Sequence, residues 1–289
     1  MNIEQWKQKG NYIDVYGKSV FHIHYKTEEP TIAFLHGYPS ASFDYYNVLP
    51  NLENSFSYII HDQIGFGLSA KPSNYSYSLI EQAEIAIELW KKLGIKEIHL
   101  VSHDYGTSVA NEIIVRKLQG FEPVKIKTIT FCNGSMHIEL AQLKLVQKLL
   151  KHPTFGKYIV ALMNKRTFIK TMQDIWFDKQ LFNIDEMNVL YDLLQLNSNN
   201  EVLHKISQYN NERVKYWHRW IGNLPNIDIP THILWAQQDP IAVRAIAEQL
   251  HKEIPNSVYT KIDNCGHYPM LEKPQEWCEK MMKFIQQNL

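Results

Sequence analysis

The chain has 289 residues and a formal net charge of zero, because 30 Lys and Arg residues balance 30 Asp and Glu residues. This balance gives no support for nucleic acid or an acidic membrane surface as the partner, and it favours a small-molecule ligand. The hydrophobic share of 45% is enough for a large core, and the length predicts one large domain or a domain with an insertion.

The cysteines and the N-terminus predict a cytoplasmic protein. Cys132, Cys265 and Cys278 are too few and too scattered for a disulfide framework, and an odd count is typical of a reducing compartment. Residues 1–7 lack the charged and then apolar pattern of a signal peptide. No run approaches the roughly 18 apolar residues of a membrane span. No CxxC or His-rich spacing indicates a metal site, so we expect no metal, and the oligomeric state stays open.

Short β-branched and aromatic runs alternate with helical patterns in the first part of the chain. A hairpin is predicted from Tyr12–Val15 and Val20–Tyr25, with Gly17 in its turn. Further strands are predicted at 31–35, 57–60, 98–101 and 126–131, and helices at 81–93 and 105–118. This alternation favours a doubly wound, mostly parallel α/β sheet.

The alternation is interrupted once. Residues 135–224 have a mostly helical pattern, and after Pro225 strands are predicted at 232–235 and 258–262, with helices at 242–251 and 275–287. We therefore predict a core formed by 1–134 and 225–289, and a helical cap formed by 135–224. The cap is expected over the carboxyl ends of the strands, where open α/β sheets bind ligands.

The segment Ser102-His103-Asp104-Tyr105-Gly106 has the layout of a nucleophile elbow, a sharp turn between a strand and a helix. The turn is crowded, so the residues two before and two after the nucleophile must be small, as Ser102 and Gly106 are. Ser102 cannot be the nucleophile, since its flanks would then be Leu100 and Asp104. The predicted nucleophile is Asp104, whose carboxylate would form an ester with an alkyl carbon. This chemistry suits epoxides and haloalkanes and does not suit peptides.

Two further residues complete a predicted catalytic triad in the chain order nucleophile, acid, histidine. Asp239 follows the strand predicted at 232–235, and His267 lies in the loop before the last helix. An Asp-Pro pair or a loop histidine is usually structural when it occurs alone. Order and context together favour the catalytic interpretation here.

Main-chain N–H groups near the elbow are predicted to form an oxyanion hole. His36-Gly37-Tyr38-Pro39 follows the strand at 31–35, and the amides of Tyr38 and Tyr105 could hold a developing oxyanion. The alternative for 36–39 is a simple turn enforced by Gly and Pro. We interpret the loop 62–69 as structural, with Asp62 accepting hydrogen bonds from the loop backbone, and His103 as structural too.

These motifs together resemble the α/β-hydrolase superfamily, and within it the branch with an aspartate nucleophile, the epoxide hydrolases and haloalkane dehalogenases. The resemblance covers nearly the whole chain, is most specific in the elbow and is weakest in the cap. It implies the α/β-hydrolase fold with an inserted helical cap, and hydrolysis through an alkyl-enzyme ester without a cofactor. The motifs that carry it are His-Gly-x-Pro at 36–39, Asp-x-x-Gly-Phe-Gly-x-Ser at 62–69, His-Asp-Tyr-Gly at 103–106, Asp239-Pro240 and Gly266-His267.

The resemblance also implies residues that bind the substrate. Epoxide hydrolases place cap tyrosines over the nucleophile, and Tyr209 resembles one of them at a similar distance before the acid (239 − 209 = 30). Tyr158 and Tyr191 are candidates for a second. Haloalkane dehalogenases usually have Trp directly after the nucleophile and often Asn in the His-Gly-x-Pro loop, where this chain has Tyr105 and Tyr38. A cap tryptophan could compensate in part, and the candidates are Trp176, Trp217 and Trp220. For each cap aromatic the alternative is ordinary packing.

The sequence thus predicts an epoxide hydrolase-like enzyme acting on a small apolar electrophile. The alternatives are a haloalkane dehalogenase, an ester hydrolase using the same site, and a non-catalytic binding protein that retains the triad. Met163, Met172 and Met187 are consistent with an apolar cleft. The cap lysines are interpreted as a solvated face: Lys144, Lys148, Lys151 and Lys157.

Overall fold

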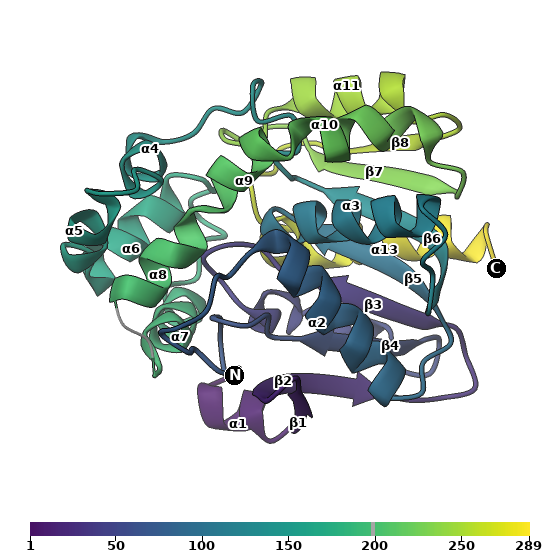
Figure 1. Cartoon of the computed structure of the whole chain (residues 1–289), viewed down its shortest axis with the longest axis horizontal. Coiled ribbons are helices and arrows are strands. Elements are labelled where there is room, and N and C mark those ends of the chain that lie inside the picture. The colour runs from purple at the N-terminus through teal and green to yellow at the C-terminus, as the bar shows by residue number, and fades with distance from the viewer. Residues whose placement is uncertain (198–199) are drawn as a thin grey trace.

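The core is a mixed, mostly parallel β-sheet, seen here in a computed structural model that describes residues 1–197 and 200–289 (Figure 1). The eight strands have the order β1-β2-β4-β3-β5-β6-β7-β8. The pairs β1–β2 and β2–β4 are antiparallel, and all pairs from β4 to β8 are parallel. The strands are β1 Asn11–Val15, β2 Lys18–Tyr25, β3 Thr31–Leu35, β4 Ser57–His61, β5 Glu97–His103, β6 Lys125–Cys132, β7 Thr231–Ala236 and β8 Val258–Ile262.

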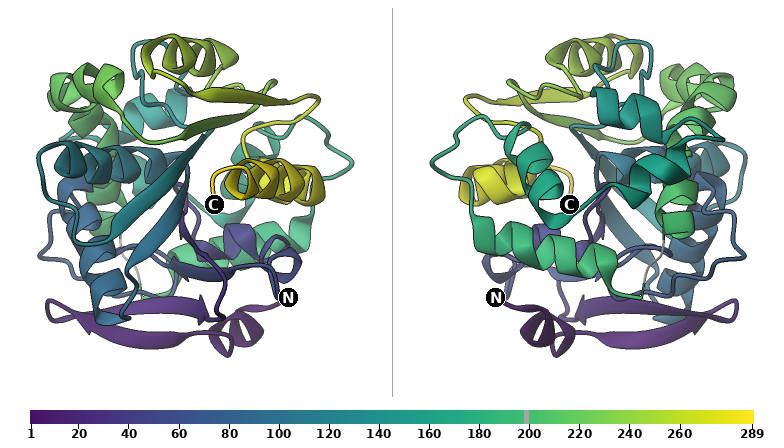
Figure 2. Two further views of the ribbon diagram at one scale, coloured as in Figure 1. Left: turned by 90° about the vertical axis from the view of Figure 1, so that its right-hand side faces the viewer. Right: turned by 90° about the vertical axis from the view of Figure 1, so that its left-hand side faces the viewer.

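Helices cover both faces of the sheet, as expected for a doubly wound fold (Figure 2). Buried side chains of α2 (Leu79–Lys92), α3 (Tyr105–Leu118) and α11 (Arg244–Glu253) form one hydrophobic cluster. Those of α1 (Ile3–Lys7) and α13 (Pro274–Gln286) belong to a second cluster. Short elements complete the core: η1 Ser42–Tyr45, η2 Leu49–Asn51 and α12 Pro269–Glu272.

The predicted hairpin, strands and helices of the core are confirmed, with small shifts at some boundaries. Helix α3 has the predicted bounds, and Gly17 lies in the hairpin turn with a positive φ of 74°. Helix α11 begins at Arg244, two residues later than predicted. The reason is that the side chain of Asp239 accepts hydrogen bonds from the amides of Ile241 and Ala242, which holds that segment in a turn.

The chain between β6 and β7 forms a helical insert beyond one edge of the sheet (Figure 1). The insert confirms the predicted architecture, whereas the domain limits 135 and 224 stay predictions. Its elements are α4 Leu145–Leu150, α5 Gly156–Ala161, α6 Lys165–Gln173, α7 Ile184–Gln195, α8 Asn200–Ser207, α9 Tyr209–Lys215, α10 Trp217–Trp220 and η3 Ile221–Asn226. None of the helices in the described ranges is long and apolar enough to cross a membrane.

A buried carboxylate anchors the end of this insert to the core. Glu112 on α3 accepts hydrogen bonds from Nε and Nη2 of Arg219 at 2.8 and 2.9 Å, and from the indole N–H of Trp220 at 2.9 Å. Arg116 also donates to Glu112, at 3.0 Å. These bonds compensate the burial of the carboxylate and fix α10 against α3. The cap is therefore held in a defined position above the elbow.

Candidate active site

Asp104 lies at the sharp turn between β5 and α3, as the elbow motif predicts. Its φ of 41° and ψ of −107° are in a region that residues other than glycine rarely adopt. The hydroxyl of Thr107 donates to the carbonyl of Asp104 at 2.6 Å, and the amide of Asp104 donates to the carbonyl of Cys132 at 3.2 Å. The surrounding contacts thus hold a strained backbone, which is a feature that clusters at functional sites.

Two groups contact the carboxylate of Asp104. The amide of Tyr38 donates to Oδ2 at 3.1 Å. Arg213 on α9 places Nη2 3.7 Å from Oδ1 and donates from the same nitrogen to the carbonyl of Asp104 at 3.0 Å. Asp104 and Arg213 are only 3% and 2% exposed. The amide and the cation both stabilise negative charge at this position.

His267 and Asp239 form the second part of the predicted triad. Nδ1 of His267 lies 2.6 Å from Oδ2 of Asp239. The same carboxylate oxygen accepts a hydrogen bond from Nδ2 of Asn133 at 2.8 Å. Burial by itself lowers the pKa of His267, but the carboxylates of Asp239, Asp104 and Asp44 outweigh it, so the pKa lies above its usual value. The histidine is therefore oriented by one carboxylate and prepared to take a proton.

The loop that carries His267 is bonded to both the core and the cap. His103 donates from Nε2 to the carbonyl of His267 at 2.8 Å, and the amide of His267 donates to the carbonyl of Ile175 at 2.9 Å. Burial of the ring, and to a smaller extent the charge of His267, lower the pKa of His103 to about 4, so this ring is neutral at pH 7. The carboxylate of Glu272 accepts from the amides of Gly266, Phe177 and Asp178. These bonds make the position of His267 depend on the cap.

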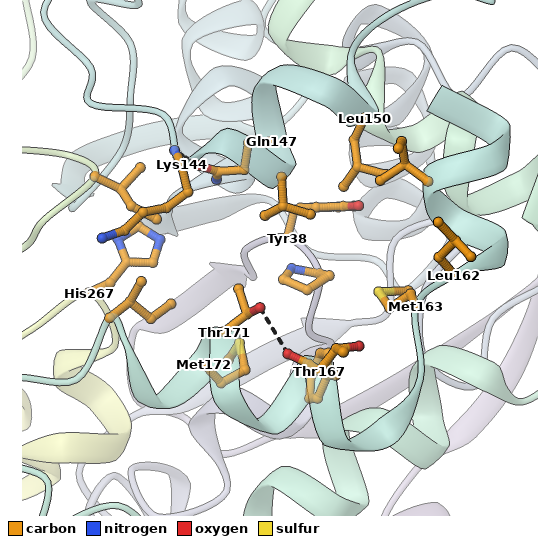
Figure 3. Close-up of a pocket in the computed structure, with 16 residues that line it drawn as sticks. Tyr38, Lys144, Gln147, Leu150, Leu162, Met163, Thr167, Thr171, Met172 and His267 are labelled. Carbon is orange, nitrogen blue, oxygen red and sulfur yellow. Dashed lines mark hydrogen bonds between the residues drawn. The ribbon is translucent and has the colours of Figure 1, made fainter. Parts of the chain in front are cut away.

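A cavity of about 250 Å³ lies between the catalytic loops and the cap (Figure 3). His267 and Tyr38 line it from the core, and Figure 3 places Leu162 and Met163 on the side away from His267. Most of the lining is apolar, which suits an apolar molecule of small or moderate size. The remaining lining residues are Pro39, Lys144, Val146, Gln147, Leu150, Ile159, Thr167, Phe168, Thr171, Met172, Ile175 and Ile241.

The structure brings Tyr209 and Tyr105 to the surroundings of Asp104. The ring of Tyr209 packs 5.4 Å from that of Tyr38 and 5.2 Å from that of Tyr105, measured between centroids. The guanidinium of Arg213 lies over the Tyr209 ring at 4.6 Å. Tyr105 is the first residue of α3, where main-chain N–H groups have no partner within the helix.

None of the predicted substrate-binding residues, Tyr209 included, is among those that line the cavity. Tyr158 is 59% exposed on α5, and Tyr191 packs on Phe168 with a centroid distance of 5.5 Å. Trp176 is buried and stacks on Tyr268 at 5.5 Å. Its indole N–H has no acceptor among the residues that the structure describes.

Arg213 and Asn133 belong to the site, although no role there was predicted for them. Asn133 follows β6 at the carboxyl edge of the sheet, and this position is a signal that could have pointed to it. Arg213 lies in a cap helix that also contains Lys215, and no motif distinguishes it. Within the described ranges, no group of His, Cys, Asp and Glu side chains is arranged to hold a metal ion.

Comparison with known proteins gives a match to the family described as alpha/beta hydrolase fold over residues 30–274. The mesoderm-specific transcript protein of Mus musculus is 31% identical over 293 residues, which cover 98% of this chain and 88% of that protein.

Solved structures with similar architecture include a dehalogenase and an epoxide hydrolase. Haloalkane dehalogenase DbeA from Bradyrhizobium elkani gives a TM-score of 0.79 with 18% identity, covering 96% of this chain and 97% of that one. Epoxide hydrolase CorEH gives a TM-score of 0.76 with 17% identity, covering 96% and 98%. At such identities the likeness establishes the fold alone.

Proposed function

The chain belongs to the α/β-hydrolase fold family, and on this basis we propose that it hydrolyses a small apolar epoxide through an ester of Asp104. One observation carries the proposal. A carboxylate occupies the elbow 3.1 Å from the Tyr38 amide, in a site that also contains the His267–Asp239 pair. Because a carboxylate reacts with alkyl carbon and not usefully with a peptide carbonyl, this arrangement supports alkyl electrophiles.

In the proposed first step, an oxygen of Asp104 attacks a ring carbon and the carbon–oxygen bond of the epoxide breaks. The released oxygen takes a proton or a hydrogen bond from the hydroxyl of Tyr209, which packs against Tyr38 and Tyr105. Burial, followed by the charge of Asp104, raises the pKa of Tyr209, so its hydroxyl keeps its proton and can donate. The product of this step is an alkyl-enzyme ester.

In the proposed second step, His267 removes a proton from water, and the resulting hydroxide attacks the carbonyl of the ester. The amides of Tyr38 and Tyr105 hold the oxyanion, and Asp239 stabilises the imidazolium. When the intermediate collapses, the bond between the carboxyl carbon and the alkyl oxygen breaks, and this oxygen takes the proton of the His267 imidazolium. The Asp104 carboxyl gives its proton back to Tyr209, so a diol is released and the Asp104 carboxylate is restored. In support, the Tyr38 amide already donates to an Asp104 oxygen in the free protein.

Hydrolysis of a carbon–halogen bond is the second candidate. The indole N–H of Trp176, which is buried without an acceptor among the described residues, is a donor of the kind that a departing halide needs. Tyr105 and Tyr38 disfavour this candidate, since neither side chain offers the N–H donor that dehalogenases usually have at these positions.

Trapping of the ester tests the proposal. The His267→Ala variant is incubated with terminal epoxides and with haloalkanes, its intact mass is measured, and the modified peptide is mapped; Asp104→Asn is the matched control. We expect an adduct on Asp104 in His267→Ala and none in Asp104→Asn. With the wild-type protein, release of a diol would support epoxide hydrolysis, and release of halide would support the second candidate. Turnover of esters without any modification of Asp104 would show that the carboxylate-nucleophile proposal is wrong.

A further inference from the structure

The charge of this protein is unevenly distributed along the chain. Residues 140–173 contain seven Lys and Arg residues and no Asp or Glu, a local charge of +7 in a chain whose net charge is zero. This segment contains α4, α5 and α6 of the cap. The basic residues are Lys144, Lys148, Lys151, Lys157, Lys165, Arg166 and Lys170. Of these, Lys165 forms an ion pair with Asp192.

The same segment exposes large apolar side chains. Leu145 is 72% exposed and Leu162 is 73% exposed, and Leu149, Phe155 and Tyr158 are also on the surface. All five lie on α4, on α5 or directly beside them. These two helices form the outer end of the cap, far from the sheet (Figures 1 and 2). Several exposed apolar side chains in one region indicate an interaction surface. We call residues 144–162 the outer face of the cap.

The cavity of the active site opens on this outer face. Leu162 lines the cavity and is at the same time largely exposed, so it lies at the opening. Lys144 also lines the cavity, and it is only partly buried. One of the exposed apolar side chains, Leu162, therefore lies at an entrance to an apolar cavity, and the others lie on the same two helices or directly beside them.

We propose that the outer face of the cap docks on the surface of a bilayer that contains anionic lipids. Lysines flank the apolar side chains, which is the composition of helices that lie in a membrane interface. The apolar side chains would enter the boundary between headgroups and acyl chains while the lysines contact lipid phosphates. A protein partner seated on this face would cover the cavity entrance, whereas a bilayer would present apolar molecules to it. The delivery of apolar molecules to the cavity rests on the proposed function, whereas the docking does not.

Vesicle co-sedimentation of the full chain tests this proposal. Vesicles of phosphatidylcholine alone are compared with vesicles that also contain about 30% phosphatidylserine, at about 0.1 M and 0.5 M salt. One variant, Leu145→Ser with Phe155→Ser, removes exposed apolar side chains. Another, Lys148→Glu with Lys157→Glu, reverses two exposed charges. The matched control is Phe121→Ser, which removes an aromatic side chain that is 48% exposed between α3 and β6, outside the outer face.

We expect binding to anionic vesicles that weakens at high salt and is at least tenfold weaker in both outer-face variants, with Phe121→Ser unchanged. For the lysine variant the size follows from about fivefold in affinity for each lysine near an anionic surface. For the apolar variant it follows from the loss of two large apolar side chains, each contributing about tenfold or more when buried. Circular dichroism melting verifies that each variant is folded. Absence of vesicle binding by the unmodified chain would overturn the proposal, as would equal binding by the outer-face variants. A dimer of the unmodified chain that becomes a monomer in the Leu145→Ser with Phe155→Ser variant, measured by gel filtration with light scattering, would also overturn the proposal. If the unmodified chain binds vesicles but does not hydrolyse epoxides, only the proposed function is contradicted.

Discussion

Gly106→Ala tests whether close contact between the elbow and the central strand positions the nucleophile. A Cβ at Gly106 would lie 2.4 Å from the carbonyl oxygen of Leu35 on β3, about 0.9 Å short of an ordinary C···O contact of about 3.3 Å. Strand β3 pairs with β4 and β5 and cannot move away, so the start of α3 must shift. Overpacking of this kind costs about 1–3 kcal/mol of unfolding free energy. A shift of that size at Asp104 also predicts a loss of about 100-fold in the rate of ester formation.

Urea unfolding and the rate of Asp104 alkylation, followed by intact mass, measure the two effects. Gly222→Ala is the matched control, because a Cβ at Gly222 would have no atom within 4 Å. We expect this control to stay within about 0.5 kcal/mol of the unmodified protein and to react at the same rate. If Gly106→Ala matches the control in both measurements, the argument that the elbow requires a small residue at 106 is refuted.

Three further predictions concern buried charges and histidines. Arg213→Met should lower the unfolding free energy by about 3 kcal/mol in urea unfolding, because it leaves the carboxylate of Asp104 without its cation. Unchanged stability would contradict a buried ion pair. Glu112→Gln should cost a similar amount, about 3 kcal/mol, and should make the cap more sensitive to limited proteolysis, since Arg219 and Arg116 lose a carboxylate. Burial, followed by the charges of His36 and His22, lowers the pKa of His61 from 6.5 to about 3. Between these values the unfolded chain binds a proton that the folded protein does not, so stability falls with falling pH by about 1.4 kcal/mol per unit at this residue. Urea unfolding at several pH values below 6.5 should show that His61→Leu reduces the slope of unfolding free energy against pH by this amount. An unchanged slope would contradict the lowered pKa of His61.

The core of the fold was predictable because its elements are strongly patterned and clearly bounded. The strand at 31–35 is a continuous apolar run, and it lies in the sheet between two parallel neighbours, buried on both faces. Helix α3 begins directly at the elbow and is followed by Gly120 with a φ of 86°, so both ends are marked in the sequence. By contrast, α1 and α12 have five and four residues, too few for a helical period to be recognised.

The candidate site was predictable only where chain order carries the information. Asp104, Asp239 and His267 each follow a strand at the carboxyl edge, and the topology alone brings such positions together. The cap offers no such rule. Its helices are short, so periodicity does not determine which face is buried, and Tyr158 is exposed while Arg213 is turned inward. The contact of Arg213 with Asp104 depends on how α9 packs over the elbow, which is a tertiary feature without a local signature.

A charged surface responds to the local charge of the protein face in contact with it and not to the net charge of the chain. A net charge of zero suggests no affinity for an acidic surface, yet electrostatic interactions in about 0.1 M salt are screened over about 10 Å. A bilayer in contact with the outer face of the cap would therefore interact with the local excess of Lys and Arg, and the acidic residues that balance the total lie elsewhere in the chain. The average over 289 residues conceals this asymmetry, because the acidic side chains are absent from 140–173 and concentrated in the remainder. Charge reversal at Lys148 and Lys157 changes the local charge from +7 to +3 and thus alters the quantity that, on this argument, determines binding.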